Sequence, residues 1–205
     1  MTGKSDMRSP TPHVERGKKA RTLRIIGGTW RGRTWRFPEG DIRPTPDRVR
    51  ETLFNWLAPW ITGSRCLDLF AGSGALGLEA LSRGAASVVF VENAAATARE
   101  LRQTLADWGG ERAAAAQVHL VGAKHFLLGA AQVFDVVFLD PPFAGGLLGQ
   151  AAAHLESGGW LAPKALIYAE CPARDPLPAL PAAWRLAKSG RAGEVGYHLL
   201  RRTPA

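Results

Sequence analysis

Beyond residue 60, short apolar runs alternate along the chain with segments that carry apolar residues at helical spacing. The apolar runs are predicted to be buried strands, at 66–70, 87–92, 117–121, 134–140 and 165–170. The helical patterns lie between them, at 75–83, 94–108, 123–130 and 147–157. This alternation predicts an α/β fold with a doubly wound, mostly parallel sheet, and runs near 184–188 and 194–202 complete seven strands.

The first quarter of the chain follows a different pattern. Residues 1–21 are rich in Pro, Ser, Lys and Arg, which predicts a disordered basic tail. Residues 22–40 read as two strands around Arg31-Gly32, which predicts a β-hairpin extension, and the main domain then spans 41–205. The main domain begins with a helix that runs to about Trp60, with Thr45 expected as its N-cap and Pro46 at its first position.

The net charge of +8 lies entirely in the first 50 residues. That segment holds 13 Lys/Arg and 5 Asp/Glu, whereas residues 51–205 hold 13 of each sign. A basic N-terminal region on a neutral body favours a polyanion partner that docks at one end. In the hairpin, Trp30 and Trp35 are expected either to stack on bases or to pack the hairpin onto the body. Its arginines are candidates for phosphate contacts, namely Arg24, Arg31, Arg33 and Arg36.

Other features exclude some classes of protein. No segment approaches the ~18 apolar residues of a membrane span, so no membrane association is expected. Cys66 and Cys171 lie in apolar surroundings, which is typical of buried thiols in a reducing cytoplasm. The histidines show no metal-ligand spacing, and no metal site is expected.

A glycine-rich loop follows the first strand of the main domain. It runs Asp68-Leu-Phe-Ala-Gly72-Ser-Gly74, and glycines there allow a tight turn and a close approach of a ligand to the backbone. The next strand ends in Glu92, whose carboxylate can accept hydrogen bonds from two ribose hydroxyls. Gly72, Gly74 and Gly77 with Glu92 also fit a dinucleotide fingerprint. Asp68, placed to face a methionine ammonium, favours S-adenosylmethionine instead.

A second motif, Asp140-Pro141-Pro142-Phe143, follows the strand at 134–140. Two consecutive prolines forbid regular structure, so the Asp140 carboxylate and the carbonyls of Asp140 and Pro141 are free to face a ligand. Such acceptors can hold the two hydrogens of an exocyclic amine and orient its lone pair toward a methyl donor. Phe143 offers a flat surface on which a base can stack. The motif therefore indicates methylation of the amine of a base.

The motifs DPPF and DLFAGSG together resemble those of the amino-methyltransferases that modify adenine N6, guanine N2 or cytosine N4. Further segments narrow the resemblance to the bacterial 16S rRNA guanine-N2 methyltransferases, a family that modifies a guanine near position 966. These segments are RIIGGTWRGR at 24–33, RPTPDRVRETLFNWL at 43–57, CLDLFAGSGALGLEALSRGA at 66–85, VFLDPPF at 137–143 and GGWLAPKALIYAE at 158–170. The resemblance covers roughly residues 22–202 and implies a Rossmann-like methyltransferase sheet.

The resemblance also implies roles for individual residues. The flipped guanine is expected to contact the catalytic residues Asp140, Pro141, Pro142 and Phe143. S-adenosyl-L-methionine is expected to contact Asp68, Phe70, Ala71, Gly72, Ser73, Gly74, Glu92, Asn93 and Ala123. The family often has Asp or Asn after the third strand, where this chain has Gly122, so backbone atoms near Ala123 are expected to recognise the adenine.

The segment 43–57 adds three arginines. Arg43 is expected to border the mouth of the pocket and to face RNA phosphate. Arg48 and Arg50 are expected either to join it or to form a solvated helix face. The expected partner is 16S rRNA within a small ribosomal subunit or an assembly intermediate, bound by a cytoplasmic monomer.

Two alternatives remain open from the residues alone. The motif at Asp140 does not separate the amines of different bases, so a DNA adenine-N6 methyltransferase is one alternative. The chain has little room for a target-recognition domain, which argues against it. A non-catalytic RNA-binding assembly factor is the other, and the presence of both Glu92 and Asp140 argues against that interpretation.

Overall fold

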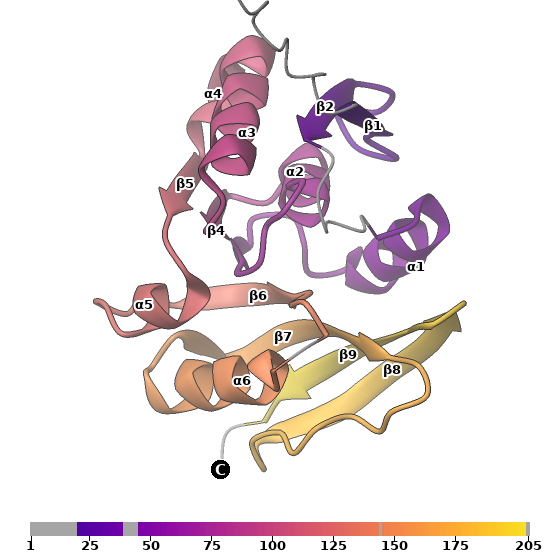
Figure 1. The fold of residues 1–205 in the computed structure, drawn as a ribbon, viewed down its shortest axis with the longest axis vertical. Coiled ribbons are helices and arrows are strands. Elements are labelled where there is room, and N and C mark those ends of the chain that lie inside the picture. Colours follow the sequence, from indigo (N-terminus) through magenta and orange to yellow (C-terminus); the bar gives the residue numbers. More distant parts are fainter. Residues whose placement is uncertain (1–19, 39–44, 144, 204–205) are drawn as a thin grey trace, which may run out of the picture.

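The computed structural model describes residues 20–38, 45–143 and 145–203 (Figure 1). One seven-stranded sheet organises the main domain, in the order β5-β4-β3-β6-β7-β9-β8. Strand β9 runs antiparallel to β7 and β8, and the other neighbouring pairs are parallel. The predicted α/β class and the mostly parallel seven-stranded sheet are confirmed. The strands are β3 (Arg65–Asp68), β4 (Ser87–Glu92), β5 (Ala116–Leu120), β6 (Phe134–Leu139), β7 (Leu161–Pro172), β8 (Trp184–Ala192) and β9 (Val195–Arg202).

Helices cover both faces of this sheet, as its nearly continuous apolar strands require. One apolar core lies under α1, α2 and α3, and a second core lies under α5 and α6 on the other face. The pattern did not predict the short helix α4, and α5 ends earlier than the expected 123–130. None of the described helices is long and apolar enough to cross a membrane. The helices are α1 (Asp47–Leu57), α2 (Ala75–Ser82), α3 (Ala95–Trp108), α4 (Gly110–Ala114), α5 (Ala123–Leu127) and α6 (Leu147–Ser157).

The expected hairpin is present as a separate two-stranded sheet of β1 (Ala20–Arg24) and β2 (Thr34–Pro38). Its first strand begins inside the segment that was expected to be a tail. Trp30 and Trp35 are 5% and 4% exposed, and both pack edge-on against Trp108 of α3. The interpretation in which they pack the hairpin onto the body is therefore correct. The alternative of base stacking is wrong, because indole rings this deeply buried present no face to a nucleotide.

The start of α1 differs from the expectation in one respect that matters for the site. Helix α1 begins at Asp47, its N-cap is Pro46, and no side chain caps it. Thr45 was expected to be the cap, but its hydroxyl donates to the carboxylate of Glu170 at 2.8 Å instead. This contact turns the hydroxyl toward β7 and away from the amides in the first turn of α1. Thr45 thus joins α1 to the end of β7.

Candidate active site

The carboxyl ends of four neighbouring strands bring four acidic residues to one edge of the sheet. Asp68 ends β3 and Glu92 ends β4, while Asp140 directly follows β6. Glu170 lies beside Asp140 because Leu139 and Ala169 pair across β6 and β7. The chain order reverses between β3 and β6, and ligands of open α/β sheets bind outside such a point.

The glycine-rich loop after β3 is held by the acidic residues on either side of it. Gly72 and Gly74 have φ angles of 49° and 76°, in the left-handed region that favours glycine. The Gly72 amide donates to Glu92 at 2.8 Å, and the Gly77 amide donates to Asp68 at 3.0 Å. A Cβ on Gly77 would lie 2.2 Å from the Phe90 ring, so this glycine permits close packing of α2 on β4.

Glu92 connects the loop to the next strand end. One carboxylate oxygen accepts from Gly72, and the other accepts from the Ala94 amide at 2.6 Å. An ionised carboxylate has about four acceptor sites, so Glu92 can still accept from a ribose. The Val121 amide donates to the Glu92 carbonyl, which places the turn at Gly122 and Ala123 beside Asn93. A Cβ on Gly122 would meet nothing within 4 Å, so the side where the adenine is expected is open.

Asp68 is buried in an environment that disfavours its charge. Burial raises the pKa of Asp68 to about 7, and the negative charge of Glu92 adds to this, against the opposing effect of the Gly77 hydrogen bond. Among the described residues, no Lys or Arg forms an ion pair with any of the four acidic residues at this edge. The edge therefore suits a cationic ligand.

Asp140 and Glu170 form a tight acidic pair at the centre of the edge. Tyr168 donates to Glu170 at 2.7 Å, and the Thr45 hydroxyl lies 3.5 Å from Asp140 while it donates to Glu170. The residue Asp140 keeps some exposed surface, but its carboxyl group lies deep. Burial and the charges of Glu170 and Asp68 raise the pKa of Asp140 well above its ordinary value. The pair therefore retains a proton at a pH where an isolated carboxyl group has lost it.

The other residues of the DPPF motif differ in their exposure to solvent. Pro141 is buried, while Pro142 is exposed and Phe143 is 48% exposed. A half-exposed phenylalanine at this edge is available for stacking, unlike the buried tryptophans of the hairpin. The remaining expected cofactor contacts line the same loop, where Phe70 is partly exposed and Ala71 and Ser73 are buried.

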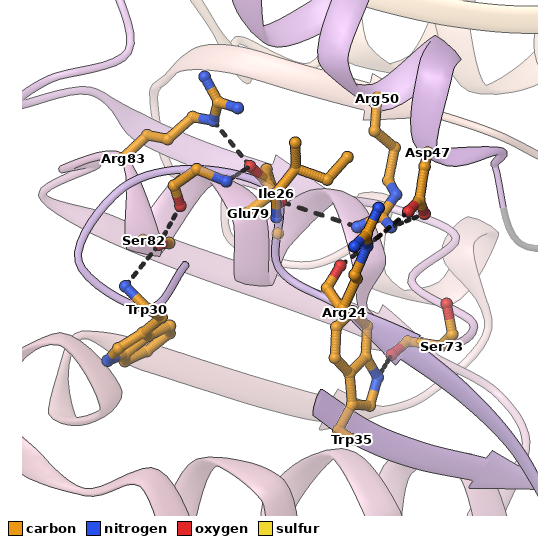
Figure 2. A network of polar contacts seen from close by, with 12 residues as sticks. Arg24, Ile26, Trp30, Trp35, Asp47, Arg50, Ser73, Glu79, Ser82 and Arg83 are labelled. Atoms are coloured by element: carbon orange, nitrogen blue, oxygen red, sulfur yellow. Dashed lines mark hydrogen bonds and ion pairs between the residues drawn. The ribbon is translucent and has the colours of Figure 1, made fainter. Parts of the chain in front are cut away.

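A polar network ties the hairpin to the back of the cofactor loop (Figure 2). Glu79 of α2 is fully buried and accepts from the amides of Ile26 and Gly27 at 2.9 and 2.8 Å. Arg83 donates to the same carboxylate at 2.8 Å, and Arg50 lies 3.7 Å from it. The two expectations for Arg50 were an RNA contact and a solvated face, and both are wrong because its side chain is buried against Glu79.

Trp35 extends this support to the loop itself. Its indole Nε1 donates to the Ser73 carbonyl at 2.8 Å, a contact that Figure 2 marks with a dashed line. The Ser82 hydroxyl accepts from the Trp30 amide at 2.9 Å, at the other end of α2. The hairpin is therefore attached to both ends of the helix that carries the glycine loop.

The arginines expected to contact RNA are placed in different ways. Arg24 is exposed and pairs with Asp47 at 3.0 Å. Arg31 and Arg36 are exposed, and Arg43 lies outside the described residues. Arg33 is engaged within the protein, since it donates to the Trp108 carbonyl and lies over the rings of Trp30 and Trp108. Two shallow hollows of about 400 and 390 Å³ lie beside the hairpin, and Arg33 and Arg36 contribute to their walls.

Comparison with known proteins agrees with this arrangement. A family model described as conserved hypothetical protein 95 matches residues 23–201. Ribosomal RNA small subunit methyltransferase D of Escherichia coli is 49% identical over 181 residues, which cover 88% of this chain and 90% of the relative. The protein of the same name from Haemophilus influenzae is 45% identical over 86% of this chain and 92% of its own length.

The chain belongs to this methyltransferase D family.

Solved structures support the assignment of the fold. A putative methyltransferase from Escherichia coli superposes with a TM-score of 0.83 at 49% identity, over 90% of this chain and 99% of that one. A Thermus thermophilus 16S rRNA N2 G1207 methyltransferase, solved with S-adenosylmethionine and guanosine, superposes with a TM-score of 0.62 at 25% identity. That alignment covers 95% of this chain and 52% of the other.

S-adenosylmethionine is the cofactor of the methyltransferase D family, and the residues present here fit it. It carries a sulfonium and an ammonium, and the edge offers Asp68, Glu92 and Asp140 with no cation beside them among the described residues. Opposite charge nearby favours an ionised carboxyl group, so a bound cation would reverse the upward shift in the pKa of Asp68. The loop at Gly72–Gly74 provides the close backbone approach.

Sequence reasoning missed Glu170, Tyr168 and Thr45 as members of the site. Glu170 carried a usable signal in the sequence, because it ends the apolar run at 165–170 as Glu92 and Asp140 end theirs, although β7 itself continues to Pro172. Tyr168 and Thr45 carried none, since their roles depend on which strands are neighbours.

Proposed function

We propose that this protein transfers the methyl group of S-adenosylmethionine to the exocyclic N2 amine of a guanine in 16S ribosomal RNA. The observation that carries the proposal is the position of the Asp140–Phe143 loop beside the Gly72–Gly74 loop, at the point where the sheet reverses its order. The names of the relatives point to small-subunit ribosomal RNA as the substrate.

The chain supports the reaction by holding the amine rather than by forming a covalent bond to it. The Asp140 carboxyl oxygen and the adjacent carbonyls accept hydrogen bonds from the amine, which turns the nitrogen lone pair toward the methyl group. Phe143 stacks on the base and keeps it outside the RNA stack. Bound S-adenosylmethionine supplies an electrophilic methyl group on a positively charged sulfur.

Charge and proton movements follow from the acidic pair. As the nitrogen–carbon bond forms and the carbon–sulfur bond breaks, the nitrogen gains positive charge and then loses one proton. Asp140 and Glu170 hold negative charge next to that nitrogen, which lowers the energy of the charged transition state. Because the pKa of Asp140 is raised, its ionised form is a better proton acceptor than an ordinary carboxylate. The proton leaves to this pair or to water.

The setting of the reaction is also part of the proposal. The substrate is 16S rRNA in a small ribosomal subunit or an assembly intermediate, the enzyme acts as a cytoplasmic monomer, and the target is the guanine near position 966 that the sequence resemblance implies. The exposed residues Arg24, Arg31 and Arg36, with Arg43, contact RNA phosphates beside the target.

The direct test uses methyl-labelled S-adenosylmethionine and small subunits from cells that lack the protein. We expect label in one guanine of the 16S rRNA, recovered as N2-methylguanosine after digestion, and no label in duplex DNA. Deproteinised 16S rRNA in a parallel reaction separates the subunit from naked RNA as the substrate. Label on adenine, or in DNA alone, would contradict the proposed target.

A further inference from the structure

The charge of the main domain is unevenly distributed, although residues 51–205 are neutral in sum. Several of its acidic residues are buried, at the carboxyl edge and in the network behind it, namely Asp68, Glu79, Glu92 and Glu170. Its basic residues are mostly on the surface, and five of them fall on the β8–β9 hairpin: Arg185, Lys188, Arg191, Arg201 and Arg202. The same hairpin has one acidic residue, Glu194, at its turn.

Three of these basic side chains share one face of the sheet. Arg185 is paired directly with Arg201, and Lys188 is paired with Leu199, across β8 and β9. Leu199 belongs to the core under α1, so this is the face that α1 and the N-terminal hairpin cover. Arg201 lies over the ring of Trp60, 6.0 Å from its centroid, and Trp60 is 46% exposed just beyond the end of α1. Arg185, Lys188, Arg201 and Trp60 are called the β8–β9 basic face below.

The pairing of Arg185 with Arg201 is unfavourable for the isolated protein. Like charges directly opposite each other on neighbouring strands destabilise a sheet. Among the described residues, none of the ion pairs involves Arg185, Lys188 or Arg201. The contacts made within the protein are the carbonyl of Ala182 for Arg185 and the Trp60 ring for Arg201. An anionic partner bound at the two arginines would offset their repulsion. No ion pair among the described residues does so.

We propose that the β8–β9 basic face binds the phosphate backbone of the ribosomal RNA that flanks the target guanine. The proposal rests on the proposed function for its partner. Arginine and lysine beside a half-exposed tryptophan match RNA, which offers both phosphates and bases that can stack. Strand β8 is three strands from β6 in the sheet, about 14 Å at ~4.8 Å per strand, and Arg201 pairs with Leu166, four residues before Glu170, which adds about 13 Å along β7. The face therefore lies on the order of 20 Å from Asp140, so it meets RNA a few nucleotides from the target base.

The position of this face gives the RNA a second contact region. The first lies on the N-terminal hairpin, where Arg24, Arg31 and Arg36 are exposed. Both regions border α1, because Arg24 pairs with Asp47 at its start and Trp60 follows its end. RNA that contacts both regions follows α1 from the carboxyl edge, where Thr45 bonds Glu170, to the β8–β9 basic face at Trp60 and Arg201. Substrate selection then depends on the shape of the RNA as well as on the target base.

The test is the triple variant Arg185→Gln, Lys188→Gln, Arg201→Gln, with Arg99→Gln as control. Arg99 is exposed on α3, which packs against β5 at the other edge of the sheet from β8. Affinity for a 16S rRNA fragment that contains the target is measured over a range of salt concentrations. Each lost phosphate contact lowers the salt slope by about 0.7–0.9, so the triple variant loses about 2–3 from it. The control keeps the wild-type slope.

A single variant separates binding from folding. Arg185→Glu places a carboxylate opposite Arg201, so the melting temperature stays the same or rises while RNA affinity falls at least several-fold. The affinity for S-adenosylmethionine is unchanged, and in methylation assays KM for RNA rises while kcat at saturation does not. A variant with weak RNA binding and a lowered melting temperature would indicate a folding role and overturn the proposal.

Two other results would overturn the proposal for the β8–β9 basic face without affecting the proposed function. An unchanged salt slope in the folded triple variant overturns this proposal and leaves the proposed function intact. Weaker binding to small subunits with unchanged binding to deproteinised RNA would mean that an acidic protein occupies the face, which also overturns it. Failure of the proposed function has a different signature, because the wild-type protein then transfers no methyl group to RNA, whatever the variants do.

Discussion

Buried carboxylates occur in two regions of this molecule, and their surroundings differ. Behind the cofactor loop, Glu79 accepts two backbone amides and lies beside Arg50 and Arg83. At the carboxyl edge, Asp68 and Asp140 lie near other carboxylates, with no paired cation among the described residues. The first arrangement satisfies a buried charge and holds the hairpin to the body. The second leaves charge unsatisfied, which is typical of a site that awaits a ligand.

The largest effect on stability is expected from removing Glu79, the buried carboxylate behind the cofactor loop that has cationic partners. Glu79→Ala removes the buried carboxylate that pairs with Arg83 and lies beside Arg50, which keeps its contact with Asp47. The amides of Ile26 and Gly27 also lose their acceptor. Removing one partner of a buried ion pair costs about 3–5 kcal/mol, and we expect a loss of this size in the free energy of unfolding. Urea denaturation measures it. Glu51→Ala, on the exposed face of α1, is the control and should change stability by less than ~0.5 kcal/mol.

At the carboxyl edge, removing the charge of Asp68 is expected to stabilise the fold. The pKa of Asp68 is raised to about 7, so the folded state keeps a proton that the unfolded state loses near pH 4. Stability contributed by this protonation is complete below pH 4 and disappears as the pH rises to about 7. Asp68→Asn has no such loss, and an amide oxygen can still accept from Gly77.

We therefore expect Asp68→Asn to be more stable than wild type by about 2–4 kcal/mol at pH 8, and nearly equal to it at pH 4. Denaturation in urea at both pH values checks this, and calorimetry should show weaker S-adenosylmethionine binding by the variant. A variant that is less stable than wild type at pH 8 would mean that the ionised Asp68 stabilises the fold, as the buried Glu79 does.

Glu92 is intermediate between the two regions, because it accepts from backbone amides and is also expected to contact the cofactor. It holds Gly72 and Ala94 in the free protein and is expected to accept from the ribose of the cofactor. Glu92→Ala should weaken S-adenosylmethionine binding by ~1–3 kcal/mol in calorimetry, the range for hydrogen bonds to a charged group. Glu92→Gln can still accept hydrogen bonds but carries no charge. Its affinity for S-adenosylmethionine should therefore lie between those of Glu92→Ala and wild type. Equal binding by Glu92→Ala and wild type would remove Glu92 from the cofactor site.

The smallest effect concerns the pH dependence of turnover. Glu170 raises the pKa of Asp140 through its charge, so Glu170→Gln should lower that pKa. Turnover that requires ionised Asp140 falls on the acid side, and this limb of the pH–rate profile should move to lower pH in the variant. Tyr168→Phe removes a neighbour of Glu170 without removing charge and serves as the control. A shift toward higher pH would contradict the coupling.

Sequence patterns predicted the parts of the site that are local in the chain. The loop from Asp68 to Gly74 and the motif at Asp140 each join a buried strand to a turn, and both can be recognised from consecutive residues alone. Glu170 could not be placed, because only the pairing of β6 with β7 brings it to Asp140, 30 residues away in the sequence. The fold class followed from alternation alone, since that pattern has few stable arrangements.

The surface of the hairpin was harder to predict for a physical reason. An arginine or tryptophan in a short strand fits an RNA contact and a buried contact equally well from its type. Burial decided between them in the hairpin: Trp30 and Trp35 are inside, while Arg24, Arg31 and Arg36 are outside. The same holds for Arg50 of α1, which is inside. The charge count also concealed the β8–β9 basic face, because buried carboxylates balanced it in the sum.

The most direct test of the central claim is turnover by Asp140→Ala at saturating S-adenosylmethionine on its RNA substrate. The glycine loop is untouched in this variant, so calorimetry should show that the cofactor still binds. Loss of one positioned electrostatic partner costs about 100–1000-fold in rate, and we expect kcat to fall by that factor, with Asp140→Asn less affected. Near wild-type turnover by Asp140→Ala would contradict the account, even if the protein methylates RNA.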